Sequence, residues 1–339
     1  MSDDNKIKLG EQLIRCVLDD KLPVDKKLRK IDYIIKMGAD VNVRHEFGYS
    51  ALGLAKAMKN EEIISFLEGK GANDIGFDKE KAEDFFKSVS VEEINNVLKV
   101  LPDGYELDCD VNLSKRGLKE LPNFSRLVVW GNFNCQYNEL ETLKGAPREV
   151  GDNFDCSNNR LNSLEGAPSI VGGFFDCSGN QLTTLKGAPR EVRGFFDCSG
   201  NQLTTLKGAP REVRGFFDCS YNGLDSLEGA PSKVWGDFGC SCNQLTSIEG
   251  APSEVGRHFD CSYNQLTSIE GAPVKVGGDF YCNNNLLISL VGAPREVGAD
   301  FDCSDNPLKS YKGKPDKIGG EFSAPDIEQV NIINAGNVR

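Results

Sequence analysis

Hydrophobic and polar positions recur with a fixed period over most of the chain. From residue 105 onward, a Phe and a Cys stand two residues apart, an Asn follows three residues after the Cys, and Leu or Ile recurs two and five residues after the Asn. This Cys returns every 21 residues from Cys135 to Cys303. Side chains two apart in a strand point to the same side. The pattern therefore predicts 11 stacked coils, nine of them regular, with parallel strands and buried columns of Phe, Cys and Leu.

The first 76 residues follow a different pattern. Their apolar residues are spaced by three and four, which predicts amphipathic helices. The triplet "GAD" at 38–40 recurs as "GAN" at 71–73, with "GYSALGLAKA" between them. Residues 77–104 contain one more expected helix, which starts near Ser90 and has Glu93 in position for a capping box. We expect this helix to cover the open end of the coils.

Both parts resemble known repeat families. The Phe-x-Cys-x-x-Asn-x-Leu-x-x-Leu pattern resembles the leucine-rich repeat, in its short bacterial form with little or no helix, over roughly residues 105–325. The stretch around "GYSALGLAKA" resembles two ankyrin repeats over roughly residues 8–74, although Ser50, Ala51 and Gly53 replace the usual Thr, Pro and His. The resemblances imply an α+β repeat protein. A small helical ankyrin-like domain (1–76) and a linker with a helical cap (77–104) precede a leucine-rich-repeat solenoid with a parallel β-sheet (105–339).

Charge narrows the range of partners. The net charge is −12, and residues 1–75 are balanced with 13 basic and 13 acidic side chains, so the whole acidic excess lies after residue 75, mostly in the coils. Such a surface repels phosphate backbones, which argues against nucleic acid and favours a protein with a basic surface. No run of 18 apolar residues predicts a membrane span, and the polar N-terminus lacks the apolar core of a signal peptide. We therefore expect a cytoplasmic protein that does not bind membranes.

The cysteines invite a metal or disulfide interpretation that their spacing does not support. They recur with the period of the coil rather than as a C-x-x-C chelate. Free Cys is among the most buried residue types. We expect reduced core residues and no metal or cofactor, with Cys16, Cys109 and Cys242 incidental.

The Asp between each core Phe and Cys is expected to face the open side of the coils. This column comprises Asp155, Asp176, Asp197, Asp218, Asp260 and Asp302, and it is interrupted by Gly239 and Tyr281. A column of Ser follows it. Like charges in neighbouring strands cost stability, so the column is either a surface kept for binding or simply the solvated face of a sheet.

The position just before the core Phe is more informative. It is polar in most regular coils but reads Phe174, Phe195 and Phe216 in three adjacent ones. The Gly two residues earlier is replaced by Arg193, Arg214 and Trp235. Part of this region is a copy, because residues 202–222 repeat residues 181–201 with one change, Gly200 to Tyr221. Exposed aromatic and Arg side chains are typical of binding sites. Alternatively, the duplication copied rings that fold into the coil.

We predict a partner-binding surface on this face. Its members are Phe174, Phe195, Phe216, Arg193, Arg214, Trp235, Asp176, Asp197, Asp218, Tyr221, His258 and Tyr263.

No catalytic set emerges from the sequence. The two histidines, His45 and His258, lie in different expected domains, and no P-loop, dinucleotide or metalloprotease motif occurs. The resemblances imply protein recognition on a long repeat surface. We expect a non-catalytic protein–protein interaction scaffold, and a phage or effector protein that blocks a host factor is one concrete form. The alternatives are a small-ligand or calcium binder that uses the Asp and Ser columns, and a structural spacer in a larger assembly.

Overall fold

The computed structural model describes residues 3–19, 21–44, 48–76, 78–99, 101 and 103–327. His45 lies outside the described residues. The chain forms two compact units. The first comprises Met1–Leu113 and Pro122–Phe133, and the second comprises Ser114–Leu121 and Asn134–Arg339.

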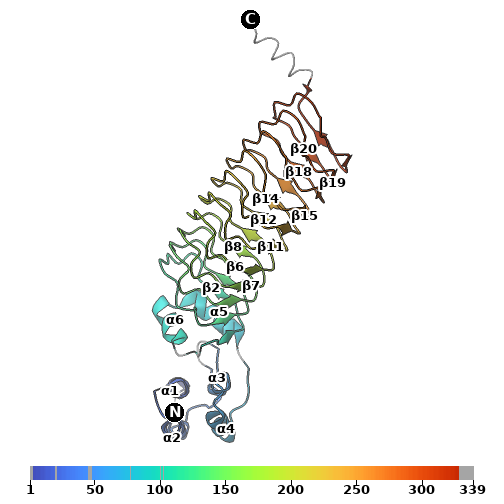
Figure 1. Cartoon of the computed structure of the whole chain (residues 1–339). Helices are drawn as coiled ribbons and strands as arrows, with labels where there is room; N and C mark the ends of the chain where they lie inside the picture. The colour runs from blue at the N-terminus through green and yellow to red at the C-terminus, as the bar shows by residue number, and fades with distance from the viewer. Residues whose placement is uncertain are drawn as a thin grey trace. The chain divides into compact units, whose positions relative to one another are not determined.

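The first unit contains the six described helices (Figure 1). They are α1 (Asp3–Leu18), α2 (Val24–Lys36), α3 (Ala51–Ala57), α4 (Glu61–Gly69), α5 (Lys79–Ser88) and α6 (Val91–Leu98). Side chains at the helix starts accept backbone amides, as Ser50 does from Gly53 and Asn60 does from Ile63. Helix α1 packs on α2, and α3 packs on α4. None of the described helices combines the length and apolarity needed to cross a bilayer. The ankyrin resemblance stays a prediction.

The helix expected after Ser90 is α6. The Ser90 side chain accepts the Glu93 amide and the Glu93 carboxylate accepts the Ser90 amide, so the predicted capping box is confirmed. Within the same unit, the ring of Phe86 in α5 lies 5.6 Å from the ring of Phe124 in the opening coils, and both side chains are fully buried. Helix α5 also packs on β2 (Val111–Asn112). Helix α5 therefore covers apolar side chains of the first coils, and the covering role expected of α6 stays a prediction.

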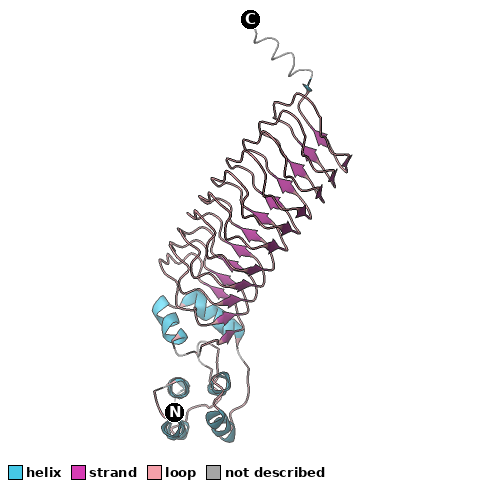
Figure 2. Cartoon of the chain, in the orientation of Figure 1, coloured by secondary structure: helices cyan, strands magenta, loops and turns pink. Residues whose placement is uncertain are grey.

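The second unit is a solenoid in which each regular coil carries two short strands (Figure 2). The strand that bears the core Phe forms the first ladder, with parallel neighbours in register. Its strands are β6 (Phe154–Asp155), β8 (Phe175–Asp176), β10 (Phe196–Asp197), β12 (Phe217–Asp218), β14 (Phe238–Gly239), β16 (Phe259–Asp260), β18 (Phe280–Tyr281), β20 (Phe301–Asp302) and β22 (Phe322–Ser323). In the opening coils, β2 and β4 (Phe133–Asn134) have the corresponding place in the sequence.

A second ladder of parallel strands precedes the first in every coil, and the sequence analysis did not predict it. It comprises β5 (Glu149–Val150), β7 (Ile170–Val171), β9 (Glu191–Val192), β11 (Glu212–Val213), β13 (Lys233–Val234), β15 (Glu254–Val255), β17 (Lys275–Val276), β19 (Glu296–Val297) and β21 (Lys317–Ile318). In the opening coils, β1 (Glu106–Leu107) pairs with β3 (Val128–Val129). Val192 and its equivalents point inward, so this ladder closes a second side of the core.

The core consists of the predicted columns. The Phe rings from Phe154 to Phe322 stack with centroids 5.2–5.9 Å apart. The repeated Cys and Leu side chains are fully buried beside them. Each buried Asn joins coils, as Asn201 shows. Its Oδ1 accepts the Leu182 amide at 3.0 Å, and its Nδ2 donates to the carbonyls of Cys177 and Cys198. The predicted leucine-rich-repeat-type solenoid is therefore confirmed.

Candidate functional site: the face between the two ladders

The residue just before each core Phe lies at a corner between the two strands of its coil. Where this corner residue is polar, its side chain accepts the backbone amide of the next corner. Asn153 Oδ1 accepts the Phe174 amide at 2.9 Å, and Asp237 Oδ1 accepts the His258 amide at 3.0 Å. Asp279 Oδ1 accepts the Asp300 amide in the same way, at 2.8 Å. These bonds satisfy backbone groups that have no strand partner at the corner.

Phe174, Phe195 and Phe216 interrupt this column of hydrogen bonds. Their rings are half-buried and stacked face to face, with centroids 4.4 Å and 4.2 Å apart and planes within 10°. A phenyl ring cannot accept an amide as Asn or Asp does. Among the described residues, no acceptor meets the amides of Phe195, Phe216 or Asp237. In these three coils, a continuous and partly exposed stack of aromatic rings therefore replaces the side-chain hydrogen bonds to the backbone.

Two residues before the corner, neighbouring coils approach very closely. A Cβ on Gly256 or Gly277 would lie 2.0 Å from the carbonyl oxygen of the preceding coil, which explains the Gly there. Arg193, Arg214 and Trp235 occupy this position in the three coils that precede Gly256.

The second ladder is interrupted between β9 and β11, the strands just before Arg193 and Arg214. These arginines extend outward and are exposed. The Nε of Arg193 donates to Glu191 at 2.8 Å. The ammonium of Lys233 lies 5.1 Å from the ring of Trp235, a cation–π contact.

The Asp column is half-buried rather than open. In Asp176, one carboxylate oxygen accepts both the amide and the hydroxyl of Ser178, at 2.9 and 2.7 Å, and Asp197 does the same with Ser199. Burial raises the pKa of Asp176, Asp197 and Asp218, although the hydrogen bonds from serine act in the opposite direction. These carboxylates therefore cap the turn after the strand, and their charges are partly desolvated.

Metal binding by these columns gains no geometric support. Within the described ranges, no three His, Cys, Asp or Glu side chains are grouped so as to hold a metal ion.

Tyr221 and Tyr263 lie just after the Ser column. Both have a positive φ, 57° and 54°, in a position that other coils fill with Gly179, Gly200 or Asn158. Non-glycine residues rarely adopt this conformation, and bulky ones least of all. The two rings are 66% and 57% exposed. A hydrogen bond to the sulfur of Cys242, in the coil between them, raises the pKa of Tyr221.

His258 is part of the corner column. Its Nδ1 accepts the Asp279 amide at 3.0 Å and lies 2.8 Å from the Asp279 carboxylate. Burial acts to raise the pKa of Asp279, but the Asp300 amide, the Tyr281 hydroxyl and His258 outweigh it and leave that pKa lowered. His258 is thus held by its neighbours.

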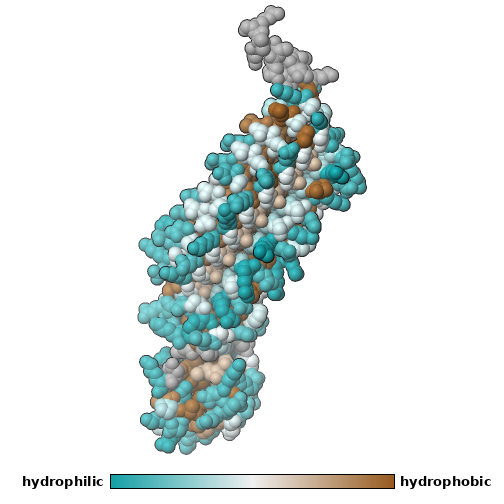
Figure 3. Space-filling model, in the orientation of Figure 1, coloured by the Kyte–Doolittle hydropathy of each residue, from teal (hydrophilic) through white to brown (hydrophobic). Residues whose placement is uncertain are grey.

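The structure brings the predicted residues together in consecutive coils. We call Phe174, Phe195, Phe216, Arg193, Arg214 and Trp235 the Phe strip. Asp176, Asp197 and Asp218 lie two residues after its rings. Tyr221 follows Phe216 in the same coil, and His258 and Tyr263 lie two coils further on. The solenoid face in Figure 3 is largely hydrophilic or neutral, with pale rows between teal ones.

One exposed apolar group was not predicted. Leu286 and Ile288 are 50% and 52% exposed, with Val291 beside them in the sequence. The preceding coil has Gln265 and Thr267 at the first two positions. A comparison of outward positions coil by coil would have found this group.

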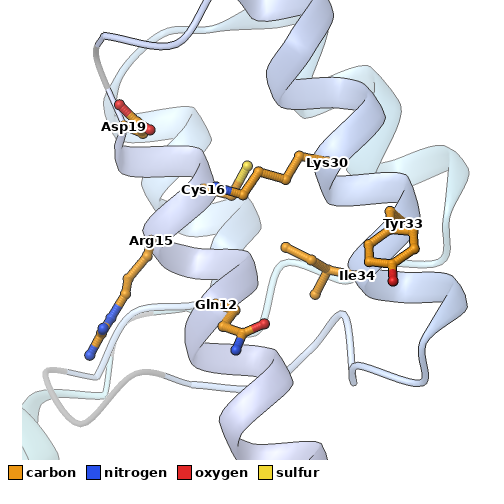
Figure 4. Close-up of a pocket in the computed structure, with 7 residues that line it drawn as sticks. All are labelled: Gln12, Arg15, Cys16, Asp19, Lys30, Tyr33 and Ile34. Atoms are coloured by element: carbon orange, nitrogen blue, oxygen red, sulfur yellow. The ribbon is translucent and has the colours of Figure 1, made fainter.

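The first unit has a cavity of about 410 Å³ between α1 and α2. Gln12 and Cys16 of α1 face Lys30 and Ile34 of α2 across it (Figure 4). Burial raises the pKa of the Cys16 thiol, whose sulfur lies 3.8 Å from the Lys27 carbonyl oxygen. A protonated thiol is a poor nucleophile, so nothing in this cavity points to chemistry.

The two ladders, the inward Phe, Cys and Leu columns and the Asn column define a leucine-rich-repeat-type solenoid. No protein-family model matches the chain, and no curated protein does. Among solved structures, the chain is similar to YopM from Yersinia pestis, described as a leucine-rich effector protein. The identity is 15% over 63% of this chain and 70% of that one, with a TM-score of 0.39. YopM from Yersinia enterocolitica is 19% identical over 76% and 71% of the two chains, with a TM-score of 0.34.

Proposed function

We propose that this protein is a non-catalytic scaffold that binds another protein through the Phe strip. One form of this function is a phage or effector protein that acts in the cytoplasm and blocks a host factor. The observation that carries the proposal is the stack of three half-exposed Phe rings, which leaves three backbone amides without an acceptor among the described residues.

Three kinds of departure from the repeat lie within the coils from Phe174 to Tyr263. Phe replaces an amide-accepting side chain, Arg or Trp replaces a Gly that close packing favours, and Tyr occupies a position with positive φ. Each departure carries a cost for the solenoid, and proteins accept such local costs mainly at functional sites. The departures also expose aromatic and Arg side chains, the types that dominate binding hot spots.

Replacement of Phe174, Phe195 and Phe216 by Asn tests the proposal. Asn stands at the equivalent position 153 and accepts the next amide there, so this variant is expected to keep its fold. Bacterial and eukaryotic lysates are passed over the immobilised full chain, and the captured protein is then titrated in solution. We expect the triple variant to bind it at least roughly 30-fold more weakly, because hot-spot side chains contribute about 2 kcal/mol or more each.

The matched control replaces Lys186, Lys207 and Glu228 by Ser. These side chains are exposed in the turns that connect the same coils, so their loss tests a surface outside the Phe strip. Equal capture by the wild type and the Phe variant would contradict the proposal, as would a loss shared by both variants. Far-UV circular dichroism and thermal unfolding of each variant verify that its fold is kept.

A further inference from the structure

We propose that the coil around Gly239 receives one cationic side chain, a Lys or Arg, from the protein that binds the Phe strip. We call Gly239, Asp218, Asp260, Tyr221 and Tyr263 the Gly239 site. The inference rests on the proposed function and specifies the chemistry of the partner.

The central feature of this site is Gly239, which has no side chain where most other coils have an Asp. Asp218, Gly239 and Asp260 are aligned in register on β12, β14 and β16. Gly239 is the only member of this column, among the regular coils described, without a side chain. A Cβ there would lie 2.9 Å from Asp218 Oδ1 and 3.2 Å from Ser220 Oγ. The Asp218 carboxylate and the Ser220 hydroxyl therefore lie directly over Gly239, and their oxygen atoms border the place that the carboxylate of an Asp would occupy in this coil.

The carboxylates of Asp218 and Asp260 in this site have no cationic partner among the described residues. Burial is the main cause of the raised pKa of Asp218, and the charges of Asp197 in the preceding coil and of Asp260, two coils on, add to it. In each carboxylate, one oxygen accepts a hydrogen bond from a turn amide, that of Ser220 for Asp218 and that of Ser262 for Asp260. None of the ion pairs found in the described residues involves Asp218 or Asp260. A positive charge placed between them would relieve their repulsion.

The two tyrosines point to the same kind of ligand. Near the start of the solenoid, Tyr137 stands in the equivalent position, and the ammonium of Lys115 from the neighbouring coil lies 5.3 Å from its ring centroid. The neighbours of Tyr221 and Tyr263 in this column are Gly200, Cys242 and Asn284. These residues bring no cation, so the exposed rings are available to one from another molecule.

The position fits a partner that also covers the Phe strip. Phe216, the last ring of the stack, is two residues before Asp218 in the same coil. The apolar stem of a Lys or Arg could lie along the rings while its charged head reaches Gly239. Acidic side chains and aromatic faces together select an organic cation.

The experiment uses small cations as probes of the full chain. n-Butylammonium and n-propylguanidinium are titrated against protein with ¹³C-labelled Asp, and n-butanol serves as the uncharged control. We expect saturable shifts of the Asp218 and Asp260 carboxyl signals, with a Kd in the millimolar range, about what a single side chain reaches, and none with butanol. No saturable shift up to about 100 mM, or an equal shift at Asp302, would overturn the inference.

The Gly239→Asp variant distinguishes a cation site that depends on the missing side chain from one that depends only on negative charge. Asp occupies this position in most coils, so the fold tolerates it, and it adds a negative charge while filling the site. We expect Gly239→Asp to weaken the binding of both cations at least about tenfold. If the cations were attracted only by the acidic charge of this face, the added carboxylate would strengthen their binding instead. Tyr263→Asn places a residue suited to the positive φ and is expected to weaken binding without loss of stability. Asp302→Asn is the remote control.

The two proposals fail separately. The Phe174, Phe195 and Phe216 to Asn variant loses the rings beside an alkyl stem but keeps both carboxylates, so butylammonium is still expected to shift the Asp218 and Asp260 signals saturably. A partner that is lost by that variant but captured equally by Gly239→Asp would support the Phe strip and overturn the Gly239 site. A partner captured by neither would support both.

Discussion

At the scale of single residues, the Cys column shows why cysteine suits this core. In Cys198, both the amide and the thiol donate to the same carbonyl, that of Asp218 in the next coil, at 2.8 and 3.2 Å. Cys177 and Cys219 repeat the arrangement. The side chain is small and apolar and also offers a weak donor, which neither Ala nor Val provides. Burial raises the pKa of these thiols well above the usual value, so they stay protonated.

This chemistry predicts selective labelling. In the native protein, one thiol per chain, that of the half-buried Cys242, is expected to react rapidly with a thiol-specific reagent, and all 12 are expected to react in denaturant. Mass spectrometry of the labelled peptides identifies the site, and Cys242→Ser removes the rapid phase. Rapid labelling of Cys198 in the folded state would contradict the core assignment.

At the scale of elements, charge order distinguishes the two halves of the second ladder. From β11 onward, the outward residue alternates as Glu212, Lys233, Glu254, Lys275 and Glu296, and the pairs Lys233–Glu254 and Lys275–Glu296 lie 2.5 and 3.3 Å apart. Duplication placed Glu191 next to Glu212 and Arg193 next to Arg214. The ladder is interrupted between these copies. Like charges on neighbouring strands are destabilising, and we attribute the interruption to them.

Restoring the alternation is expected to close the ladder. Glu191→Lys combined with Arg193→Gly continues the Glu–Lys order and returns the Gly that close packing favours. The residue-214 amide, which has no acceptor among the described residues, should then exchange hydrogen more slowly. Stability is expected to rise by about 0.5 kcal/mol, in the range of one cross-strand pair.

Lys275→Glu is the matched control, because it creates like-charged neighbours in the intact half. It is expected to destabilise the protein by a similar amount. If the control behaves so while the amide of residue 214 still exchanges rapidly, charge does not open the ladder.

Much of this element structure could be predicted from the sequence. The period placed the Phe, Cys, Asn and Leu columns correctly, because each side chain repeats in every coil. The second ladder was missed, since its strands are two residues long and only Val192 and its equivalents are apolar. The half-burial of Asp176 depends on its bond to Ser178, and the stacking of Phe174 on Phe195 depends on rotamers of neighbouring coils. Such contacts across coils leave no signal in a single repeat.

At the scale of the whole molecule, the solenoid's stability is a sum of coils and of contacts between neighbours. At neutral pH, the ionised Asp column lowers the stability of the folded solenoid. A carboxyl whose pKa is higher in the folded state binds more protons there than in the unfolded chain, so stability falls as pH rises through this window. Asp176, Asp197 and Asp218 all shift in this direction.

A difference measurement isolates this effect. We expect the wild type to gain stability, relative to an Asp176, Asp197 and Asp218 to Asn variant, as pH is lowered from about 7 towards 4, near the pKa of an unfolded Asp. Urea midpoints of both proteins across this range provide the test. Glu191, whose pKa is lowered by Arg193, is present in both proteins and cancels. A pH-independent difference would show that these carboxyls titrate normally.

The copied coil has a consequence for how this protein evolves. Because 21 residues close one turn and the two copies differ only at Gly200 and Tyr221, unequal recombination between them adds or deletes a complete turn without disturbing the phase of the rest. Each such event also adds or deletes one ring of the aromatic stack. The lineage can therefore lengthen or shorten its recognition surface in single inherited steps, with no new point substitution.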